Sequence, residues 1–550
     1  MSQREKAILG FLALLLIISL SLSITGYVNR NSQLIAQDGG TYTEALVGQP
    51  RYINPILAST NDVDLELTRV LYSSLFVLGP DLKLANDLAT SVETSADGKT
   101  YTIKIREDAT WHDGQKVTAE DVLFTITSIQ TKDYNSSLAS SFQGVQVTKV
   151  DDYTVRFTLQ KTAYAPFLSS LTVGIVPKHV WENVAPKTIG LAEQQLKPIG
   201  SGPFKFEEIV TKKKTGEITS IKLARNDDYY GEKAHISNLV FNFFNTHEES
   251  LAALTSAKAD GVGYLPSSLY PSVKNRSGLT VRKVLLPQYF GLFFNQAKNP
   301  ILGDAGVRAA LGLAVDREEI VKEALSEQGE PLNLPIPSGI FSFSDIEKPA
   351  FDIEKAKQNL DEAGWKVVGD DGVREKDGKK LEVTITTTDW QEYVKTAEVI
   401  QETWKQIGVK TNIQSLGTGI IQQTAVIPRE YQILLYGENL AADPDPYPFW
   451  HSTQTKSPGL NLSLLEDKEI DKLLEDSRTT NDQQKRNELL HLFTKRFLDI
   501  HPAIILYRPY YLFVQRSHVG GIGMEQGALP SDRFNDIVKW YVRVKRVWNS

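Results

Sequence analysis

The spacing of apolar and polar residues differs between the first and second halves of the chain. In the first half, strict alternation predicts a strand-rich region. Tyr101 to Ile105 and Val155 to Leu159 alternate in the manner of half-buried strands. Between them, Thr118 and Asp121 form a capping-box-like start for a helix whose apolar positions recur at helical spacing from Val122 to Ile129. This part of the chain is therefore predicted to be strand-rich with one helix inside it.

The second half of the chain interleaves helices with strands. Asp352 is placed to cap a helix that ends at Gly364. Leu381 to Ile385 alternates as a strand, and Val394 to Ile407 carries one apolar face at helical spacing before Gly408. Helices interleaved with strands indicate an α/β lobe.

One apolar run near the N-terminus is long enough to cross a membrane. Ala7 to Val28 contains 22 residues without a charged side chain, and about 20 such residues span the hydrocarbon core of a bilayer. Arg4 and Lys6 precede the run. Because positive residues favour the cytoplasmic side, the rest of the chain is expected to lie outside the cytoplasm.

Two interpretations of this segment stay open, an uncleaved anchor and a cleaved secretory signal. Ser23 to Gly26 offers a poor version of the small-x-small site that signal cleavage requires. We therefore expect the anchor. Asn29 to Gly40 is polar without periodicity, so residues 1–38 are predicted to form the anchor, or signal, and a tether.

Length and composition then narrow the class of protein. A chain of 550 residues exceeds the size of one hydrophobic core, so two or more lobes are expected. The net charge is −7 with both signs interspersed, which makes nucleic acid an unlikely partner in the absence of any basic stripe. The sequence contains no cysteine, which excludes disulfides, thiolate metal sites, a cysteine nucleophile and a lipid-modified N-terminal cysteine.

Motifs of common enzyme sites are incomplete. The position four after His247 is Leu251, so a zinc-protease helix is not present. Ser201 lacks the outer glycine of a nucleophile elbow because Ile199 stands two residues before it. We expect a protein that is not an enzyme and that needs no cofactor or metal. A hydrolase built from carboxylates distant in sequence stays as an unfavoured alternative.

Short motifs in a fixed order then point to a family. They are Ile53-Asn54-Pro55, Leu71-Tyr72-Ser73-Ser74-Leu75-Phe76, Asp87-Leu88-Ala89, Trp111-His112-Asp113-Gly114, Thr118-Ala119-Glu120-Asp121-Val122, Gly200-Ser201-Gly202-Pro203-Phe204, Asn295, Val307-Arg308, Ala310-Leu311, Asp316-Arg317, Glu362-Ala363-Gly364-Trp365 and Asp443-Pro444-Asp445-Pro446. Each motif alone is weak, but their order is specific. From about Leu46 to Val542 the chain resembles solute-binding protein family 5 of ABC importers, the oligopeptide-, dipeptide- and nickel-type extracellular binding proteins.

The resemblance implies an α/β, two-lobed periplasmic-binding-protein-like fold of type II with an extra domain inserted in the first lobe. Ligand is expected to be enclosed when the lobes close. The implied domains are lobe I at 41–78, 186–287 and 505–550, the inserted domain at 79–185, and lobe II at 288–504.

The resemblance also implies a function. The chain is expected to bind a peptide or peptide-like solute between its lobes and to deliver it to an ABC permease in the membrane. We expect a monomer, tethered outside the cytoplasm at the periplasmic or cell surface. A sensory protein that uses the same fold to report ligand to a membrane partner is the alternative.

Candidate ligand-binding residues follow from the same resemblance. In peptide-binding relatives the ligand backbone pairs with extended segments of both lobes, a mode in which main-chain hydrogen bonds supply the affinity. The matching positions are Ser59, Thr60, Asn61, Leu435, Tyr436 and Gly437. Trp450 is an aromatic candidate for the pocket wall, with burial in the core as the alternative, and Tyr289 is a candidate for ligand contact.

Relatives carry an aspartate beyond the second segment that holds the terminal ammonium of the ligand, in the pattern Ala-Asp-x-x-Asp-Pro. Here Ala442 occupies the expected place, between Ala441 and Asp443. Asp443 is the candidate substitute, with Asp445 beside it and Glu438 as a weaker candidate. The alternative is that both aspartates only shape a proline turn.

Overall fold

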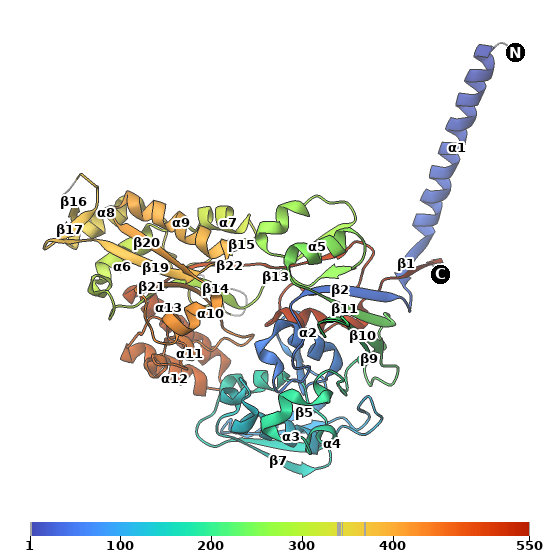
Figure 1. Cartoon of the computed structure of the whole chain (residues 1–550), viewed down its shortest axis with the longest axis horizontal. Coiled ribbons are helices and arrows are strands. Elements are labelled where there is room, and N and C mark those ends of the chain that lie inside the picture. Colours follow the sequence, from blue (N-terminus) through green and yellow to red (C-terminus); the bar gives the residue numbers. More distant parts are fainter. Residues whose placement is uncertain (1–2, 338–340, 342, 344, 368–369, 549–550) are drawn as a thin grey trace.

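The computed structural model describes residues 3–548 except 338–340, 342, 344 and 368–369. Two large mixed sheets form the centres of two lobes that lie side by side, with a third body of strands and helices below the first lobe (Figure 1). The predicted α/β, two-lobed architecture with an inserted domain thus matches the arrangement of the elements.

Lobe I is built on a seven-stranded sheet in the order β13-β23-β12-β2-β11-β10-β9. Its strands are β2 (Thr41–Val47), β9 (Phe204–Thr211), β10 (Ile218–Arg225), β11 (Asn238–Phe244), β12 (Gly261–Val262), β13 (Leu279–Val284) and β23 (Tyr511–Arg516). β2 runs parallel to both β11 and β12, and the other pairs are antiparallel. Helices α2 (Asp62–Leu71) and α5 (His247–Thr255) belong to this lobe.

The inserted domain contains the strands and the helix predicted from alternation. Its four-stranded antiparallel sheet has the order β5-β6-β8-β7. The elements are β5 (Ala89–Thr94), β6 (Thr100–Ile105), α3 (Ala119–Gln130), β7 (Val145–Asp151), β8 (Thr154–Leu159) and α4 (Lys178–Trp181), preceded by the pair β3 (Phe76–Leu78) and β4 (Leu84–Asn86). The capping box of Thr118 and Asp121 is present at the start of α3. One apolar core runs through this domain and lobe I.

Lobe II is built on a six-stranded sheet in the order β15-β22-β14-β21-β19-β20. Its strands are β14 (Gln288–Phe294), β15 (Gly329–Pro331), β19 (Glu382–Thr388), β20 (Lys410–Leu416), β21 (Ile433–Asn439) and β22 (Ala503–Pro509). Its helices are α6 (Ala305–Leu313), α7 (Arg317–Leu325), α8 (Ile353–Glu362), α9 (Gln391–Gln406), α10 (Thr418–Ile421), α11 (Tyr447–Trp450), α12 (Lys468–Thr479) and α13 (Gln483–Ile500). A small sheet of β16 (Lys366–Val367), β17 (Arg374–Lys376) and β18 (Lys379–Lys380) lies at its edge.

Both faces of the lobe II sheet are covered. Ile433 and Leu435 of β21 pack with α6, α7, α8 and α9 on one face, and Leu434 packs with α11, α12 and α13 on the other. Successive side chains of a strand point to opposite faces, so a strand buried on both sides is apolar at every position rather than alternating. This explains why residues 433–435 are a continuous apolar run.

Two short crossings connect the lobes. The first lies between Val284 of β13 and Gln288 of β14, and the second is Tyr510, between β22 and β23. Because β22 pairs with β14 in the lobe II sheet, the second crossing falls at Tyr510 and not at the predicted boundary between 504 and 505. Apolar composition alone could not separate β22 from β23, since both are buried.

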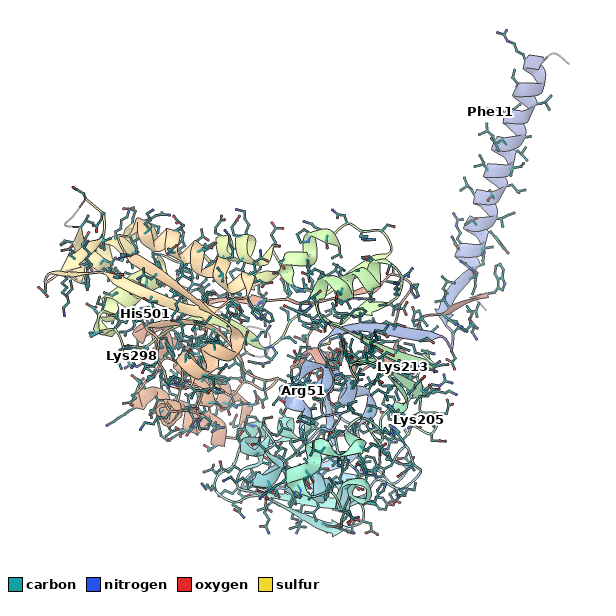
Figure 2. The ribbon with its side chains drawn as sticks, in the orientation of Figure 1. Phe11, Arg51, Lys205, Lys213, Lys298 and His501 are labelled. Atoms are coloured by element: carbon teal, nitrogen blue, oxygen red, sulfur yellow. The ribbon has the colours of Figure 1, made fainter. Side chains whose placement is uncertain are left out.

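The N-terminal helix stands apart from the body. α1 (Gln3–Asn31) projects away from lobe I, and the labelled Phe11 points outward from it (Figures 1 and 2). The most apolar 18-residue stretch of its segment Ile8–Asn31 has a mean hydropathy of 2.5 and no buried residue, so the helix is long and apolar enough to cross a membrane. The segment after it differs from the predicted tether: β1 (Ser32–Ala36) pairs antiparallel with β24 (Val544–Trp548).

A buried ion cluster in lobe I joins the C-terminal segment of the chain to strand β2 and helix α2. The Arg533 guanidinium is fully buried and lies 2.8 Å from Glu44 of β2 and 2.7 Å from Glu66 of α2. Burial raises the pKa of Glu66 to about 8 and also raises that of Glu44, although Arg533 acts in the opposite direction. The cluster therefore depends on the buried cation.

Replacing Arg533 with methionine should destabilise lobe I strongly. Arg533→Met leaves two buried carboxyl groups without their cation, and breaking a buried ion pair costs about 3–5 kcal/mol. The free energy of unfolding measured in urea should fall by that amount. The triple variant Arg533→Met, Glu44→Gln, Glu66→Gln should recover a large part of the loss, and equal stability of the single and triple variants would contradict this account.

Candidate functional site

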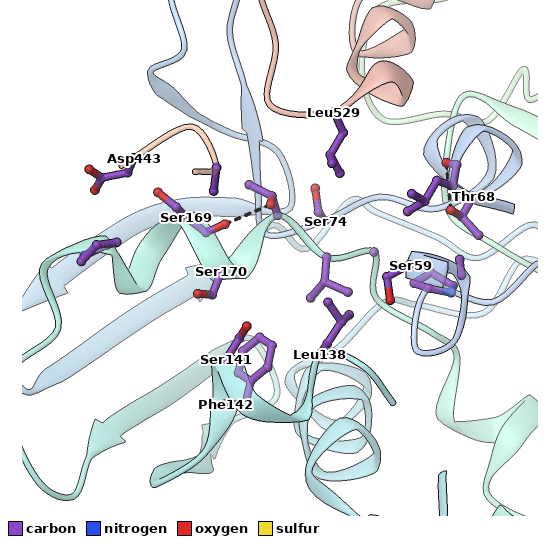
Figure 3. A pocket seen from close by; sticks show the side chains of 18 of the residues that line it. Ser59, Thr68, Ser74, Leu138, Ser141, Phe142, Ser169, Ser170, Asp443 and Leu529 are labelled. Atoms are coloured by element: carbon purple, nitrogen blue, oxygen red, sulfur yellow. Dashed lines mark hydrogen bonds between the residues drawn. The ribbon is translucent and has the colours of Figure 1, made fainter. Parts of the chain in front are cut away.

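A cavity of about 310 Å³ lies where lobe I, the inserted domain and lobe II meet. Hydroxyl groups from the first two parts line much of it. They include Ser59, Thr68, Ser74, Ser141, Ser169 and Ser170. Figure 3 shows these side chains around the space, with Asp443 and Leu529, from other segments of the chain, above them in this view. The charged residues of the lining are Arg69, Asp443 and Asp445.

Of the first predicted contact segment, Ser59 faces the cavity. It lies in the short helical turn Ala58–Thr60, and its hydroxyl is hydrogen bonded to that of Ser137. Thr60 is exposed outside the cavity lining. Asn61 has a structural role: its side chain accepts from the Val63 N–H at the start of α2.

The second predicted segment is the C-terminal half of β21, which has one open edge. β14 pairs with β21 along its whole length, from Ile433 to Asn439. On the other side, β19 pairs with β21 at Ile433 and Leu434. Within the part of the chain that the structure describes, no strand pairs with Tyr436–Asn439 on that side. This edge ends directly before Leu440 and Ala441, which line the cavity.

Gly437 is one of the residues whose main chain faces this open edge. The Leu435 carbonyl accepts from the Thr387 hydroxyl of β19 at 3.1 Å, whereas the Leu440 N–H donates to Pro287, before β14, at 2.8 Å. Main-chain groups alternate between the two sides of a strand, so those of Gly437 point to the same side as Leu435, away from β14. A side chain at this position would come within 2.6 Å of the Phe290 ring.

Three predicted side chains are buried in lobe II and do not line the cavity. Leu435 belongs to the core under α6 to α9, and Trp450 is fully buried against Phe293 and Phe497 on the opposite face. Tyr289 is likewise fully buried. Trp450 therefore has the role of its alternative, burial in the core, and Tyr289, which was predicted to contact the ligand, lies in the core as well.

Glu438 is also enclosed. It is 5% exposed and accepts a hydrogen bond from the Tyr289 hydroxyl. Burial raises the pKa of this carboxyl well above its usual range, since the charged form is poorly solvated there. Glu438 is not among the residues that line the cavity, and β21 alternation places it on the same face of the strand as Leu434. Tyr436 is half-buried on this side and receives a hydrogen bond from Gln422.

The two aspartates of the predicted clamp both line the cavity, and both have arginine partners. Asp443 lies 2.5 Å from the Arg486 guanidinium, which also donates to the Pro444 carbonyl at 2.8 Å. Asp445 accepts from Arg478 at 2.8 and 2.9 Å. The aspartates therefore do more than shape a turn, because each anchors a guanidinium of the following helices.

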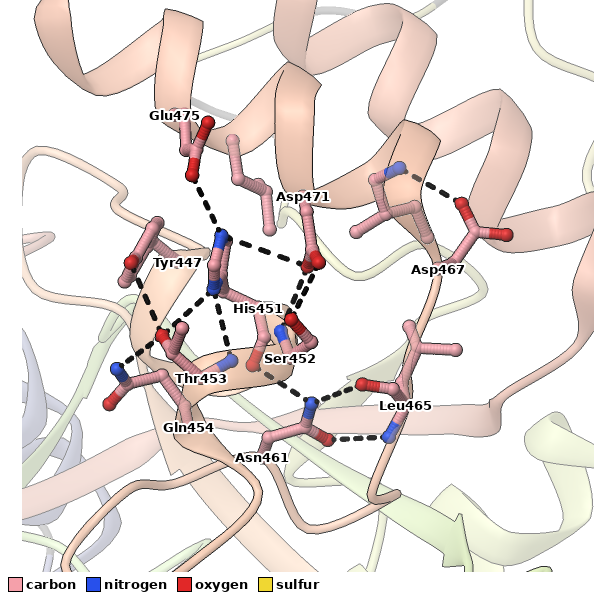
Figure 4. A network of polar contacts seen from close by, with 12 residues as sticks. Tyr447, His451, Ser452, Thr453, Gln454, Asn461, Leu465, Asp467, Asp471 and Glu475 are labelled. Carbon is pink, nitrogen blue, oxygen red and sulfur yellow. Dashed lines mark hydrogen bonds and ion pairs between the residues drawn. The ribbon is translucent and has the colours of Figure 1, made fainter.

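A polar network fixes the segment after α11 beside these aspartates (Figure 4). His451 Nε2 lies 3.8 Å from Asp471 and 3.4 Å from Glu475. The Ser452 N–H and hydroxyl donate to Asp471 at 2.8 and 2.6 Å. Asp471 and Glu475 belong to α12, as does Arg478, so the network holds in place the helix whose guanidinium pairs with Asp445. Among the described residues no group is arranged to hold a metal ion.

The comparison with protein families identifies the fold. A model described as "Bacterial extracellular solute-binding proteins, family 5 Middle" matches residues 83–461. The chain belongs to this family. The resemblance noted from the motifs is thereby confirmed, and members of the family are solute-binding proteins rather than enzymes.

Family 5 relatives are similar over nearly the whole chain. Oligopeptide-binding protein AppA of Bacillus subtilis (strain 168) is 30% identical over 556 aligned residues, covering 98% of this chain and 99% of that protein. The structure of AppA from Bacillus subtilis in complex with a nonapeptide has a TM-score of 0.74 at 29% identity, covering 92% of this chain and all of that one. The substrate-binding protein CtaP of Listeria monocytogenes has a TM-score of 0.80 at 27% identity, with the same coverage. The predicted two-lobed α/β fold is confirmed.

One contact across this family 5 cavity joins the inserted domain to lobe II. The Tyr164 hydroxyl donates to Asp445 at 3.2 Å, and the Arg478 guanidinium lies 5.0 Å from the centre of the Tyr164 ring. A second contact joins lobe I to lobe II, where the Ser267 hydroxyl donates to Glu392 at 3.0 Å. The motifs gave no signal for Tyr164 or Arg478, because neither residue lies in any of the family motifs found in the sequence.

Tyr164→Phe should favour separation of the lobes. The variant loses one hydrogen bond that exists only while the lobes are in contact, worth about 0.5–1.5 kcal/mol, or a roughly 2- to 10-fold change in the open-to-closed ratio. Fluorophores on Lys161→Cys and Lys485→Cys would report the distance between lobes, since the chain has no other cysteine. Tyr153→Phe, in the turn between β7 and β8, is the control. Equal distance distributions for the two variants would show that the Tyr164–Asp445 hydrogen bond does not hold the lobes together.

Proposed function

We propose that this chain binds a peptide between its two lobes and delivers it, as a monomer, to an ABC permease in the membrane. The observation that carries the proposal is the open edge of β21 at the cavity. An exposed strand edge presents N–H and C=O groups that an extended peptide can pair with. The relatives support the same class of ligand, since AppA is named an oligopeptide-binding protein and its structure holds a nonapeptide.

Main-chain pairing explains how such a protein could accept many sequences. Hydrogen bonds from Gly437 to the ligand backbone do not depend on the ligand side chains. A ligand that touches β21 and the hydroxyl-lined wall of the inserted domain contacts both lobes at once. Such a ligand binds the closed arrangement better than the open one and shifts the population toward it.

Replacing single amide hydrogens in the ligand tests the pairing. In a bound nonapeptide, N-methylation at the residue opposite Gly437 should weaken binding roughly 2- to 10-fold, because one hydrogen bond is worth about 0.5–1.5 kcal/mol. Calorimetry across a series methylated at one position at a time should show the loss at alternate residues, since strand pairing uses every second residue on one side. A peptide with the same backbone and shuffled side chains is the control.

Two outcomes would contradict the proposal. If no member of a mixed nonapeptide library is retained by the protein, peptide is not its ligand. If methylation has no effect at any position while shuffling abolishes binding, the ligand is recognised through its side chains and not through β21.

We also propose that α1 is an uncleaved anchor, with the body outside the cytoplasm. The helix continues without a break to Asn31, and β1 begins at the next residue and pairs with β24. Arg546 of β24 donates to Asn29 and to Ser32 at 3.1 and 2.8 Å. The helix and the body are therefore joined by hydrogen-bonded structure and not by an unpaired tether, and the poor cleavage site at 23–26 lies inside the continuous helix.

The N-terminus of the native protein decides between anchor and signal. Mass spectrometry of protein extracted from membranes should recover peptides from the segment before Ala7, and the protein should resist extraction with alkaline carbonate, because a spanning helix is held by its apolar length. Recovery of a mature N-terminus between residues 23 and 41 would show that the segment is a cleaved signal.

A further inference from the structure

The charges of the cavity are already compensated within the protein. Arg69 lies 2.9 Å from Asp532, Asp443 lies 2.5 Å from Arg486, and Asp445 lies 2.8 Å from Arg478. These pairs include each charged residue of the described lining. A carboxylate that is neutralised by a guanidinium exerts little net attraction on a second cation, and the guanidinium itself repels one.

Arg486 and Arg478 are held in place by further contacts besides those with the two aspartates. The Arg486 side chain is 5% exposed, and its guanidinium also donates to the Pro444 carbonyl. Releasing Asp443 for a ligand ammonium would leave that guanidinium buried without a counter-ion, which is costly. Arg478 lies in addition 4.1 Å from the centre of the Tyr447 ring, a favourable cation–π distance.

The other polar side chains of the lining are neutral hydroxyl groups among apolar residues, and three of these hydroxyls have spare hydrogen-bonding capacity. Among the described residues, the hydroxyls of Ser141, Ser169 and Ser170 have no hydrogen-bond partner, although all three line the cavity. A hydroxyl can donate and accept. Such a wall can bind an amide or a hydroxyl of the ligand, but it cannot neutralise a charge.

We propose that the ligand group held in this cavity is an uncharged amide, supplied by an N-acylated peptide end or by an internal peptide unit, and not a free terminal ammonium. The inference rests on the proposed peptide-binding function and specifies its ligand. The Asp443–Arg486 and Asp445–Arg478 pairs make the cavity unsuited to a cation.

Two nonapeptide amide libraries that differ only in N-terminal acetylation test this proposal. The full-length protein in detergent is incubated with an equal mixture, and the retained peptides are counted by mass spectrometry. We expect acetylated peptides to be retained at least as well as free amines, and up to about 3-fold better. A third library, with two extra residues before the free amine, separates the sources: retention equal to the acetylated library indicates an internal peptide unit, and a deficit indicates an acylated end.

Arg486→Gln tests the cause. Because Asp443 then presents an unpaired carboxylate, the ratio of free to acetylated peptides retained should rise about 10-fold, whereas Arg486→Lys, which keeps the charge, should leave the ratio near that of the native protein. Arg478→Gln is the parallel variant at Asp445, and thermal unfolding identifies any variant that does not fold.

The outcomes are separable. Retention of free amines 10-fold or more above acetylated peptides by the native protein would overturn the inference while leaving peptide binding intact. An unchanged ratio in folded Arg486→Gln and Arg478→Gln would also overturn it. Retention of none of the three libraries would refute the proposed function itself, and the inference with it.

Discussion

The covalent connection between the lobes constrains everything else in the molecule. It consists of the three residues between Val284 and Gln288 and of Tyr510. The two crossings are neighbours, because β13 pairs with β23 on one side of them and β14 pairs with β22 on the other. Pro287 and Pro509 restrict the backbone at each crossing. Two short adjacent segments allow one lobe to rotate relative to the other about a single axis and allow little sliding between the lobes. The contacts between the lobes at the cavity can therefore form and break together.

The sequence predicted most of the local structure but few of the contacts between residues that are distant in sequence. The capping box at Thr118 and the cap at Asp352 are local signals, and both are present. The pairing of Asp443 with Arg486 joins residues 43 positions apart, and no local pattern encodes it. Such contacts depend on how α13 packs under the sheet.

The candidate site shows the same division. Ser59 and Asp443 were predicted from motifs and line the cavity. Two roles were left open for Trp450, a place in the pocket wall or burial in the core, because periodicity does not say which of two apolar faces meets the other lobe. In the structure Trp450 is part of the core. The serines of the inserted domain were missed, since serine in a turn carries no pattern that separates a binding surface from an ordinary loop.

The pairing of β1 with β24 has a consequence for how the protein is made. Ser32 and Arg546, which are hydrogen bonded, are separated by 514 positions. Contacts between distant positions form slowly, because the loop between them must first be closed. β1, which directly follows α1, therefore pairs with β24 only after the body has been synthesised and folded. Until then the orientation of the body relative to α1 is not fixed. Pairing of β24 with β1 fixes it.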